Sequence, residues 1–267
     1  VAAKFGMPLI GVMGEVDIAR VNQNIIKAKH YGAKLKAVPG TLKEAITDAI
    51  KTWTTNPDFA YICGSVVSSH PFPKIVAFAQ SIIGREIREQ SLEQEGKLPD
   101  MIVGCVGGGS NFAGAIYDFL DEPSVSKIGV EAHETAALSN GTPGIMQGMK
   151  TYMLQTDDGA KSLGGMSLGA GITYFSVGPL HSYLRDQKAV TYSSATDQEM
   201  LEAYKIIART EGICSALEPM AAAAEVIFRQ AKNKPKDYTI CLSLCGRGEK
   251  DLDTIQEHIG KDFEWTI

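Results

Sequence analysis

Short apolar segments alternate with segments of helical periodicity along most of this chain, and this alternation limits the folds open to it. Five segments have the length and composition of single strands: residues 8–14, 33–38, 101–106, 127–131 and 238–244. Most of them run into glycine or proline, which interrupt regular structure. Strands that are separated by helices favour a mostly parallel sheet with helices packed against it. The sequence therefore predicts the α/β class.

The intervening segments carry apolar residues at helical spacing. Helices are expected at residues 17–31, 41–54, 74–94, 197–211 and 218–232. Thr41 followed three residues later by Glu44 resembles a capping box, which favours a helix start at this point. Residues 60–63 are expected to form a short strand. Residues 132–171 are glycine-rich without a clear period, so a functional loop is expected there.

Composition and charge exclude several classes of protein. With 44% hydrophobic and 21% charged residues, a chain of 267 residues can bury a core and is not expected to be disordered. The formal charge of −5 disfavours general binding to a nucleic acid backbone. No apolar run reaches the roughly 18 residues that a membrane span needs. The five cysteines form no Cys-X-X-Cys pair and no zinc-ligand spacing, so we expect free thiols in a reducing cytoplasm.

The sharpest local signal is a glycine-rich segment between a predicted strand and a predicted helix. Gly107, Gly108 and Gly109 follow the strand, and Ser110 and Asn111 lead into the helix. Glycines let backbone N–H groups point at a ligand without Cβ clashes, and a helix N-terminus favours an anion. The lysine of a nucleoside triphosphate loop and the Gly-X-Gly-X-X-Gly spacing of a dinucleotide site are both absent. A phosphomonoester is the best-fitting ligand, and a tight turn without a ligand is the alternative.

Several motifs, in their order and spacing, resemble those of the tryptophan synthase β subunits, which are pyridoxal phosphate (PLP) enzymes of fold type II. The motifs include His-Pro-Phe-Pro at 70–73, Cys-Val-Gly-Gly-Gly-Ser-Asn at 105–111, Ser-Val-Gly-Pro at 176–179, Ala-Leu-Glu at 216–218 and Gly-Arg-Gly-Glu-Lys-Asp at 246–251. The resemblance covers essentially every residue. It implies twisted, mostly parallel sheets with flanking helices. It also implies a partial N-terminal, communication-type domain at residues 1–70 and a C-terminal α/β domain at residues 71–267.

The resemblance implies a set of cofactor and substrate contacts. The residues that match the family's PLP contacts are Ser65, Gly107, Gly108, Gly109, Ser110, Asn111, Gly171, Glu218, Cys245 and Gly246. Thr173 matches a position that contacts the amino-acid substrate. No metal ion is required, although backbone carbonyls of Val106, Gly107, Tyr174 and Ser176 match the family's monovalent-cation site. From the residues alone, an ordinary helix N-terminal acid for Glu218 and a small buried apolar residue for Cys245 stay open as alternatives.

Two of these positions depart from the family pattern. The family has a serine facing the pyridine nitrogen of the cofactor, and this chain has Cys245 there. Like a hydroxyl, a thiol does not protonate that nitrogen as an aspartate does, which suits β-elimination and β-replacement better than transamination. The family also has an aspartate where this chain has Thr173. Threonine keeps a hydrogen bond and loses the charge, which bears on substrate preference.

The implied activity is a PLP-dependent lyase reaction of the tryptophan synthase β type. L-Serine and indole give L-tryptophan and water, the last step of tryptophan biosynthesis. The family forms homodimers and often binds an α subunit that channels indole. Neither nucleic acid nor a membrane is an expected partner, and the expected location is the cytoplasm.

The lysine that binds the cofactor covalently has no match in this sequence. In the family it stands in a His-Lys-X-Asn motif, which does not occur among the 267 residues. We expect Val1 to align after that motif, so that the chain corresponds to the C-terminal two-thirds of the family pattern and no catalytic residue is identifiable. The alternatives are a serine or threonine dehydratase-type PLP enzyme and a truncated, non-catalytic relative that binds PLP or phosphate.

Overall fold

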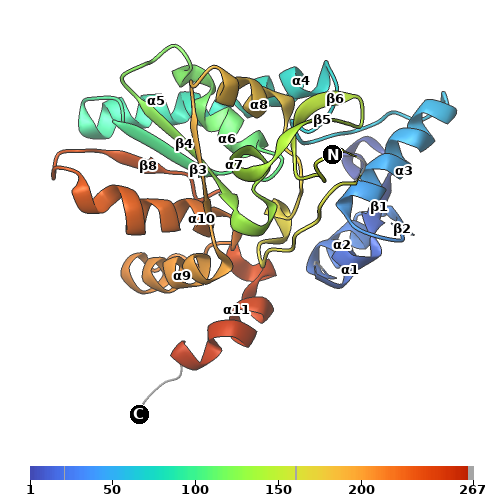
Figure 1. Cartoon of the computed structure of the whole chain (residues 1–267). Coiled ribbons are helices and arrows are strands. Elements are labelled where there is room, and N and C mark those ends of the chain that lie inside the picture. Colours follow the sequence, from blue (N-terminus) through green and yellow to red (C-terminus); the bar gives the residue numbers. More distant parts are fainter. Residues whose placement is uncertain (21, 160, 264–267) are drawn as a thin grey trace. The chain divides into compact units, whose positions relative to one another are not determined.

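The computed structural model divides the chain into two compact units, residues 1–62 and residues 63–267 (Figure 1). It describes residues 1–20, 22–159 and 161–263. The glycine-rich segment at residues 107–111 belongs to the second unit.

The first unit is built on two parallel strands. Strands β1 (Ile10–Gly14) and β2 (Lys34–Val38) pair in register from Ile10 opposite Lys34. Its helices are η1 (Ala3–Phe5, a 3-10 helix), α1 (Glu15–Arg20), α2 (Asn22–His30) and α3 (Leu42–Thr55). Helix α3 packs against β1 and begins with the predicted capping box, in which the Thr41 N–H donates to Glu44 Oε2 at 2.8 Å. The prediction of a helix start at this point is confirmed.

The second unit contains a four-stranded, entirely parallel sheet, which confirms the predicted class. The strands are β3 (Met101–Cys105), β4 (Ser126–Ala132), β7 (Thr191–Ala195) and β8 (Ile240–Leu242), in the order β7-β4-β3-β8. Strand β7 was not among the segments expected from the sequence. Its residues are small and polar, and only Ala195 among them is buried, so the apolar signal of a strand is weak there.

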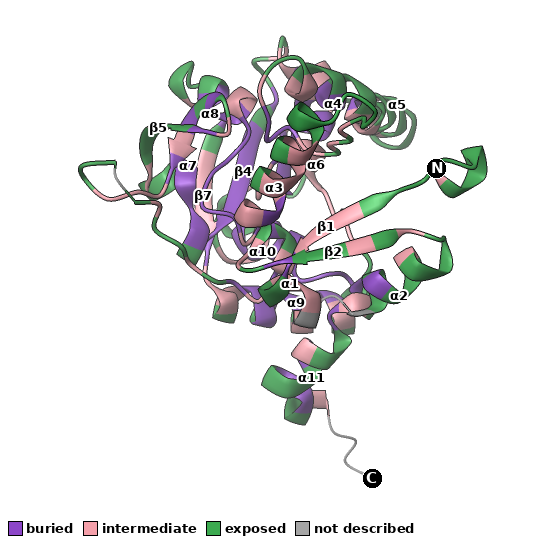
Figure 2. Ribbon diagram, turned by 90° about the vertical axis from the view of Figure 1, so that its right-hand side faces the viewer, coloured by how far each residue is buried: buried purple, intermediate pink, exposed green. Residues whose placement is uncertain are grey.

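Helices cover both faces of this sheet (Figure 1). On one face lie α9 (Asp197–Glu211) and α10 (Glu218–Glu225), and on the other lie α4 (Phe72–Gln80), α5 (Ile82–Glu95) and α6 (Ser110–Ile116). Alternate residues of β3 serve the two faces: Val103 and Cys105 pack with α9 and α10, and Ile102 packs with α6. Strand β4 is buried along almost its whole length (Figure 2). The sheet is therefore the middle layer of three.

A glycine in β3 allows α6 to approach the sheet closely. A Cβ at Gly104 would lie 2.7 Å from Cδ2 of Phe112, the third residue of α6. Because Phe112 is completely buried over this strand, the position tolerates no larger residue. The close approach fixes the turn that joins β3 to α6, which is the glycine-rich segment.

Three local predictions were wrong. Residues 60–63 form no strand. The helix expected at 74–94 is divided into α4 and α5 at Ser81, whose hydroxyl donates to the Phe78 carbonyl at 2.7 Å. Residues 132–171 are not one loop, because they contain α7 (Ala137–Asn140) and an antiparallel hairpin of β5 (Thr142–Met146) and β6 (Met149–Met153).

The remaining helical segments are short. They are the 3-10 helices η2 (Tyr117–Phe119), η3 (His133–Thr135), η4 (Ala170–Ile172), η6 (Ala231–Asn233), η7 (Gly248–Lys250) and η8 (Gly260–Phe263), the π-helix η5 (Val226–Gln230), and the α-helices α8 (Pro179–Asp186) and α11 (Leu252–Ile259). The helix expected at 218–232 therefore changes from α10 to π-helix after Glu225. Among the described residues, no helix is long and apolar enough to cross a membrane.

Candidate active site

The glycine-rich segment forms the turn between β3 and α6, as the sequence predicts. Gly109 has φ +100°, a conformation that favours glycine, and its carbonyl accepts the Ala113 N–H at 2.9 Å. Within residues 1–20, 22–159 and 161–263, nothing accepts a hydrogen bond from the N–H groups of Gly107, Gly108 or Gly109. Three successive backbone donors are therefore available to an anionic ligand.

The turn packs tightly between two other segments. A Cβ at Gly107 would lie 2.6 Å from the Gly171 carbonyl oxygen and 2.8 Å from the Ile172 Cα. A Cβ at Gly108 would overlap the Ser65 hydroxyl oxygen. The structure thus brings together four residues that the resemblance assigns to the cofactor, although they come from three separate parts of the sequence.

Glu218 lies beside the same turn, at the start of α10. Its Oε1 accepts the Gly171 N–H at 2.7 Å, and both of its carboxylate oxygens accept from Lys250 Nζ at 2.8 Å. Lys250 also donates to both oxygens of Asp251, whose Oδ2 accepts the Leu217 N–H at 2.9 Å. The structure therefore adds an ion-pair network that sequence reasoning missed, since Lys250 and Asp251 counted there only as parts of a motif.

The network keeps Lys250 charged. Burial alone would lower the pKa of Lys250. The charge of Glu218 and the hydrogen bonds to both carboxylates outweigh burial, so the pKa of Lys250 is raised above its ordinary value. A lysine in this state is a structural cation rather than a nucleophile, because a nucleophilic lysine needs a lowered pKa.

Cys245 lies three residues beyond β8 and close to Cys105, the last residue of β3. The two sulfur atoms are 3.6 Å apart. The hydrogen bond between them and burial raise the pKa of the Cys105 thiol well above its usual value. That hydrogen bond lowers the pKa of Cys245 and outweighs the effects of burial and of the Glu218 charge. Cys105 therefore keeps its proton and donates it to the Cys245 sulfur.

Gly246 connects Cys245 to the start of α10. Its carbonyl accepts the Ala216 N–H at 3.0 Å and the Ser215 hydroxyl at 3.2 Å. A Cβ at this glycine would lie 2.9 Å from the Ala216 Cβ. The segments that carry Cys245 and Glu218 are thus held against each other.

The other predicted positions lie on the segment that follows η4. The Thr173 hydroxyl lies 3.1 Å from the Gly169 carbonyl and 3.2 Å from the Ser167 carbonyl, to which it can donate, and it accepts the Ser167 N–H at 3.3 Å. Ser176 is buried and its hydroxyl donates to the Tyr152 carbonyl at 3.4 Å. In the described part of the chain, no group of three or more His, Cys, Asp or Glu side chains could hold a metal ion.

His181 is a second residue that sequence reasoning missed. It lies in α8, is completely buried, and contacts the glycine-rich turn: its Nε2 is 2.8 Å from the Gly109 carbonyl oxygen. Its Nδ1 is 2.9 Å from the Tyr192 hydroxyl on β7. No local pattern reveals this role, because both partners are distant in the sequence.

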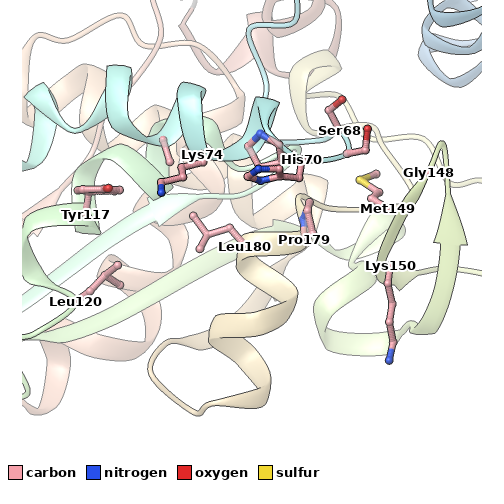
Figure 3. Close-up of a pocket in the computed structure, with 13 residues that line it drawn as sticks. Ser68, His70, Lys74, Tyr117, Leu120, Gly148, Met149, Lys150, Pro179 and Leu180 are labelled. Atoms are coloured by element: carbon pink, nitrogen blue, oxygen red, sulfur yellow. The ribbon is translucent and has the colours of Figure 1, made fainter.

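A cavity of about 580 Å³ lies elsewhere in the second unit (Figure 3). It is lined by side chains of α4, of η2, of the β5–β6 turn and of the start of α8, among them His70, Lys74, Tyr117 and Leu180. The Lys150 side chain points away from His70 in this view (Figure 3). None of the residues predicted to contact the cofactor lines this cavity.

The comparisons with known proteins agree on one family. The family model described as "Pyridoxal-phosphate dependent enzyme" matches residues 1–246. The tryptophan synthase beta chain of Dinoroseobacter shibae is 42% identical over 280 residues, which cover 100% of this chain and 68% of that protein. The tryptophan synthase beta chain of Ruegeria pomeroyi is 43% identical over 279 residues, covering 100% of this chain and 67% of that protein.

Solved structures support the fold. The crystal structure of the O-ureido-L-serine-bound K43A mutant of O-ureido-L-serine synthase matches with a TM-score of 0.70 at 16% identity, over 97% of this chain and 70% of that one. The threonine deaminase of T.th. matches with a TM-score of 0.68 at 19% identity, over 93% and 72%. At these identities the matches show the fold alone. Together with the sequence relatives, they establish that the chain belongs to the pyridoxal-phosphate-dependent enzymes and, within them, to the tryptophan synthase beta chain family.

Proposed function

We propose that the protein catalyses a PLP-dependent β-replacement, in which L-serine and indole give L-tryptophan and water. The observation that carries the proposal is the triple-glycine turn, whose N–H groups are available to a ligand, in a chain 42% identical to a tryptophan synthase beta chain. The residues present fit the cofactor. The glycines that line the turn have no Cβ to obstruct it, and within the described part of the chain their N–H groups donate no other hydrogen bond.

The phosphate group of the cofactor is assigned to the turn. We propose that the N–H groups of Gly107, Gly108 and Gly109 bind it, together with Ser110 and Asn111. Hydrogen bonds from neutral N–H groups to a charged phosphate are short and strong. The Ser65 side chain, which packs against Gly108, completes this end of the site.

The ring of the cofactor is assigned to the neighbourhood of Cys245, Gly246, Gly171 and Glu218. Bound PLP supplies an electron sink for the electron pair released at the substrate Cα. Cys245 is placed to face the ring nitrogen and, as a thiol, leaves that nitrogen unprotonated. Glu218 is held by Lys250 and by the Gly171 N–H, so its carboxylate cannot rotate freely beside the ring.

We assign no lysine of this chain to the covalent bond with the cofactor. Lys250 is the described lysine that contacts a predicted site residue, and its raised pKa and two carboxylate partners oppose a nucleophilic role. The assignment leaves Lys250 as a positioning residue for Glu218.

The substrate hydroxyl is assigned to Thr173. In the structure the Thr173 hydroxyl bonds within its own turn, to carbonyls of Ser167 and Gly169. Contact with L-serine would therefore exchange one of these bonds for a bond to the substrate. A neutral threonine makes this exchange at a smaller desolvation cost than an aspartate would.

Several wider features are part of the proposal. Residues 1–70 are proposed as a communication-type domain and residues 71–267 as the cofactor domain; the compact unit at 1–62 supports this division. A homodimer, association with an α subunit, and a monovalent cation at the carbonyls of Val106, Gly107, Tyr174 and Ser176 follow from family membership. Five free cysteines among the described residues support a reducing cytoplasm.

Turnover of L-serine with and without indole tests the function. The protein is expressed from its complete gene, supplied with PLP, and assayed for tryptophan and for pyruvate. We expect tryptophan when indole is present. Pyruvate formation at a rate that indole does not change would instead identify a serine or threonine dehydratase. PLP binding without any turnover of L-serine would identify a non-catalytic relative.

A further inference from the structure

His181 is buried completely, and both of its ring nitrogens are hydrogen-bonded. A carbonyl oxygen can only accept, so the bond to Gly109 requires the hydrogen on Nε2. Nδ1 is then the acceptor for the Tyr192 hydroxyl. Burial lowers the pKa of His181 to about 4, so the ring is neutral near pH 7 and stays in this tautomer.

The imidazole lies directly against the glycine-rich turn. A Cβ at Gly109 would overlap the ring, and the ring stacks on Phe112 of α6 at a centroid distance of 6.0 Å with an interplanar angle of 12°. Phe112 and Tyr192 contact two sides of the ring, with Tyr192 perpendicular to it. The Nε2–H therefore has a fixed direction.

Two successive carbonyls of the turn are bonded to the same segment. Gly178, immediately before α8, donates its N–H to the Gly108 carbonyl at 3.1 Å, and His181 donates to the next carbonyl, that of Gly109. In a trans peptide the C=O of one residue and the N–H of the next point in opposite directions. Holding these two carbonyls therefore directs the N–H groups of Gly109 and Ser110 to the other side of the turn.

We propose that His181 is a positioning residue for the cofactor phosphate, which it serves by holding the Gly109 carbonyl and so aiming the Ser110 N–H at the phosphate oxygens. This inference rests on the proposed function. His181 does not touch the phosphate itself. Its role is to hold the peptide group in the bound orientation before the ligand arrives, which lowers the cost of binding.

Equilibrium binding of PLP and of pyridoxal, which lacks the phosphate, tests the inference. His181→Phe removes the donor, and His181→Gln replaces Nε2–H with an amide N–H at a similar distance from the backbone. We expect His181→Phe to raise the dissociation constant of PLP about tenfold or more while that of pyridoxal changes little, because a hydrogen bond to a charged group is lost. His181→Gln should restore most of the PLP affinity.

A purely structural role predicts a different pattern. Equal weakening of PLP and pyridoxal in both variants, in parallel with a lower midpoint of urea unfolding, would overturn the inference. If His181→Phe fails to fold, Tyr192→Phe replaces it, because it removes only the hydroxyl that fixes the tautomer. A smaller loss confined to PLP supports the inference, and unchanged PLP affinity overturns it. A wild-type protein that binds neither compound would overturn the proposed function as well.

Discussion

The sulfur atoms of Cys105 and Cys245 lie 3.6 Å apart, where the neighbouring strands β3 and β8 end. Neighbouring strands are separated by about 4.8 Å, which lies within the span that a disulfide bridges. The hydrogen bond from Cys105 lowers the pKa of Cys245, so Cys245 is the thiol that reacts first. Because Cys245 is assigned to the cofactor ring, the oxidation state of this pair bears on the site.

We expect hydrogen peroxide to convert this pair to a disulfide. Cys245 is oxidised to a sulfenic acid with release of one water, and Cys105 then displaces a second water to form the S–S bond. The number of thiols that iodoacetamide alkylates in the unfolded protein should fall by two, and dithiothreitol should restore both. Cys245→Ser is the matched control and should lose no thiol pair. Equal thiol loss in Cys245→Ser and the wild type would show that other cysteines react instead.

Gly107 should tolerate no side chain. A Cβ at this position would lie 2.6 Å and 2.8 Å from backbone atoms of Gly171 and Ile172, which cannot rotate away as a side chain could. We expect Gly107→Ala to weaken PLP binding strongly and to lower the free energy of unfolding by about 1–3 kcal/mol. Gly64→Ala is the control, because a Cβ at Gly64 has open space around it. The urea midpoint and the PLP dissociation constant of both variants decide the matter, and similar values for the two would contradict this account.

Removing the cation of the Glu218 network should be costly. Lys250→Met leaves the buried carboxylates of Glu218 and Asp251 without their shared partner. The Lys250 side chain is 25% exposed, so we expect a loss of about 2–3 kcal/mol in the free energy of unfolding, below the range for fully enclosed pairs. Lys36→Met, which breaks the exposed pair with Asp48, should change stability little. A small effect of both substitutions on urea unfolding would refute the structural role of Lys250.

The parallel sheet and the glycine-rich turn could be predicted from the sequence because each depends on neighbouring residues. Residues 101–106 alternate between two buried faces, and the three glycines follow at once. The α3 capping box is equally local, since Thr41 and Glu44 bond to each other.

The roles of His181 and Lys250 could not be predicted in this way. His181 bonds to Gly109, 72 residues away, and Lys250 bonds to Glu218, 32 residues away. Such partners are set by the packing of α8 on the turn and of η7 on α10, which no periodicity records. The division of the helix at Ser81 has the same origin. Helical spacing continues across it, but Gly84 packs on the α6 backbone, where a Cβ would lie 2.8 Å from the Gly114 carbonyl oxygen.

Two buried groups should give stability opposite dependences on pH. Burial raises the pKa of Glu131 from 4.5 to about 7, although hydrogen bonds from the Leu138 N–H and from Ser139 oppose the shift. The folded protein then binds the Glu131 proton more tightly than the unfolded chain does. This contribution to stability is complete below pH 4.5 and is lost as the pH rises through about 7.

His181 acts in the other direction, because its pKa falls from 6.5 to about 4 on burial. The unfolded chain binds this proton more tightly, so the contribution is complete above pH 6.5 and is lost as the pH falls through about 4. Each shift corresponds to about 3 kcal/mol, and between pH 4.5 and 6.5 the two nearly cancel. His181→Gln removes one of them. Urea unfolding should then show that the variant loses stability relative to the wild type as the pH rises from 4.5 to 6.5, by up to about 3 kcal/mol. Since the other titrating groups are common to both proteins, a difference that stays constant with pH would mean that His181 is not held neutral by burial.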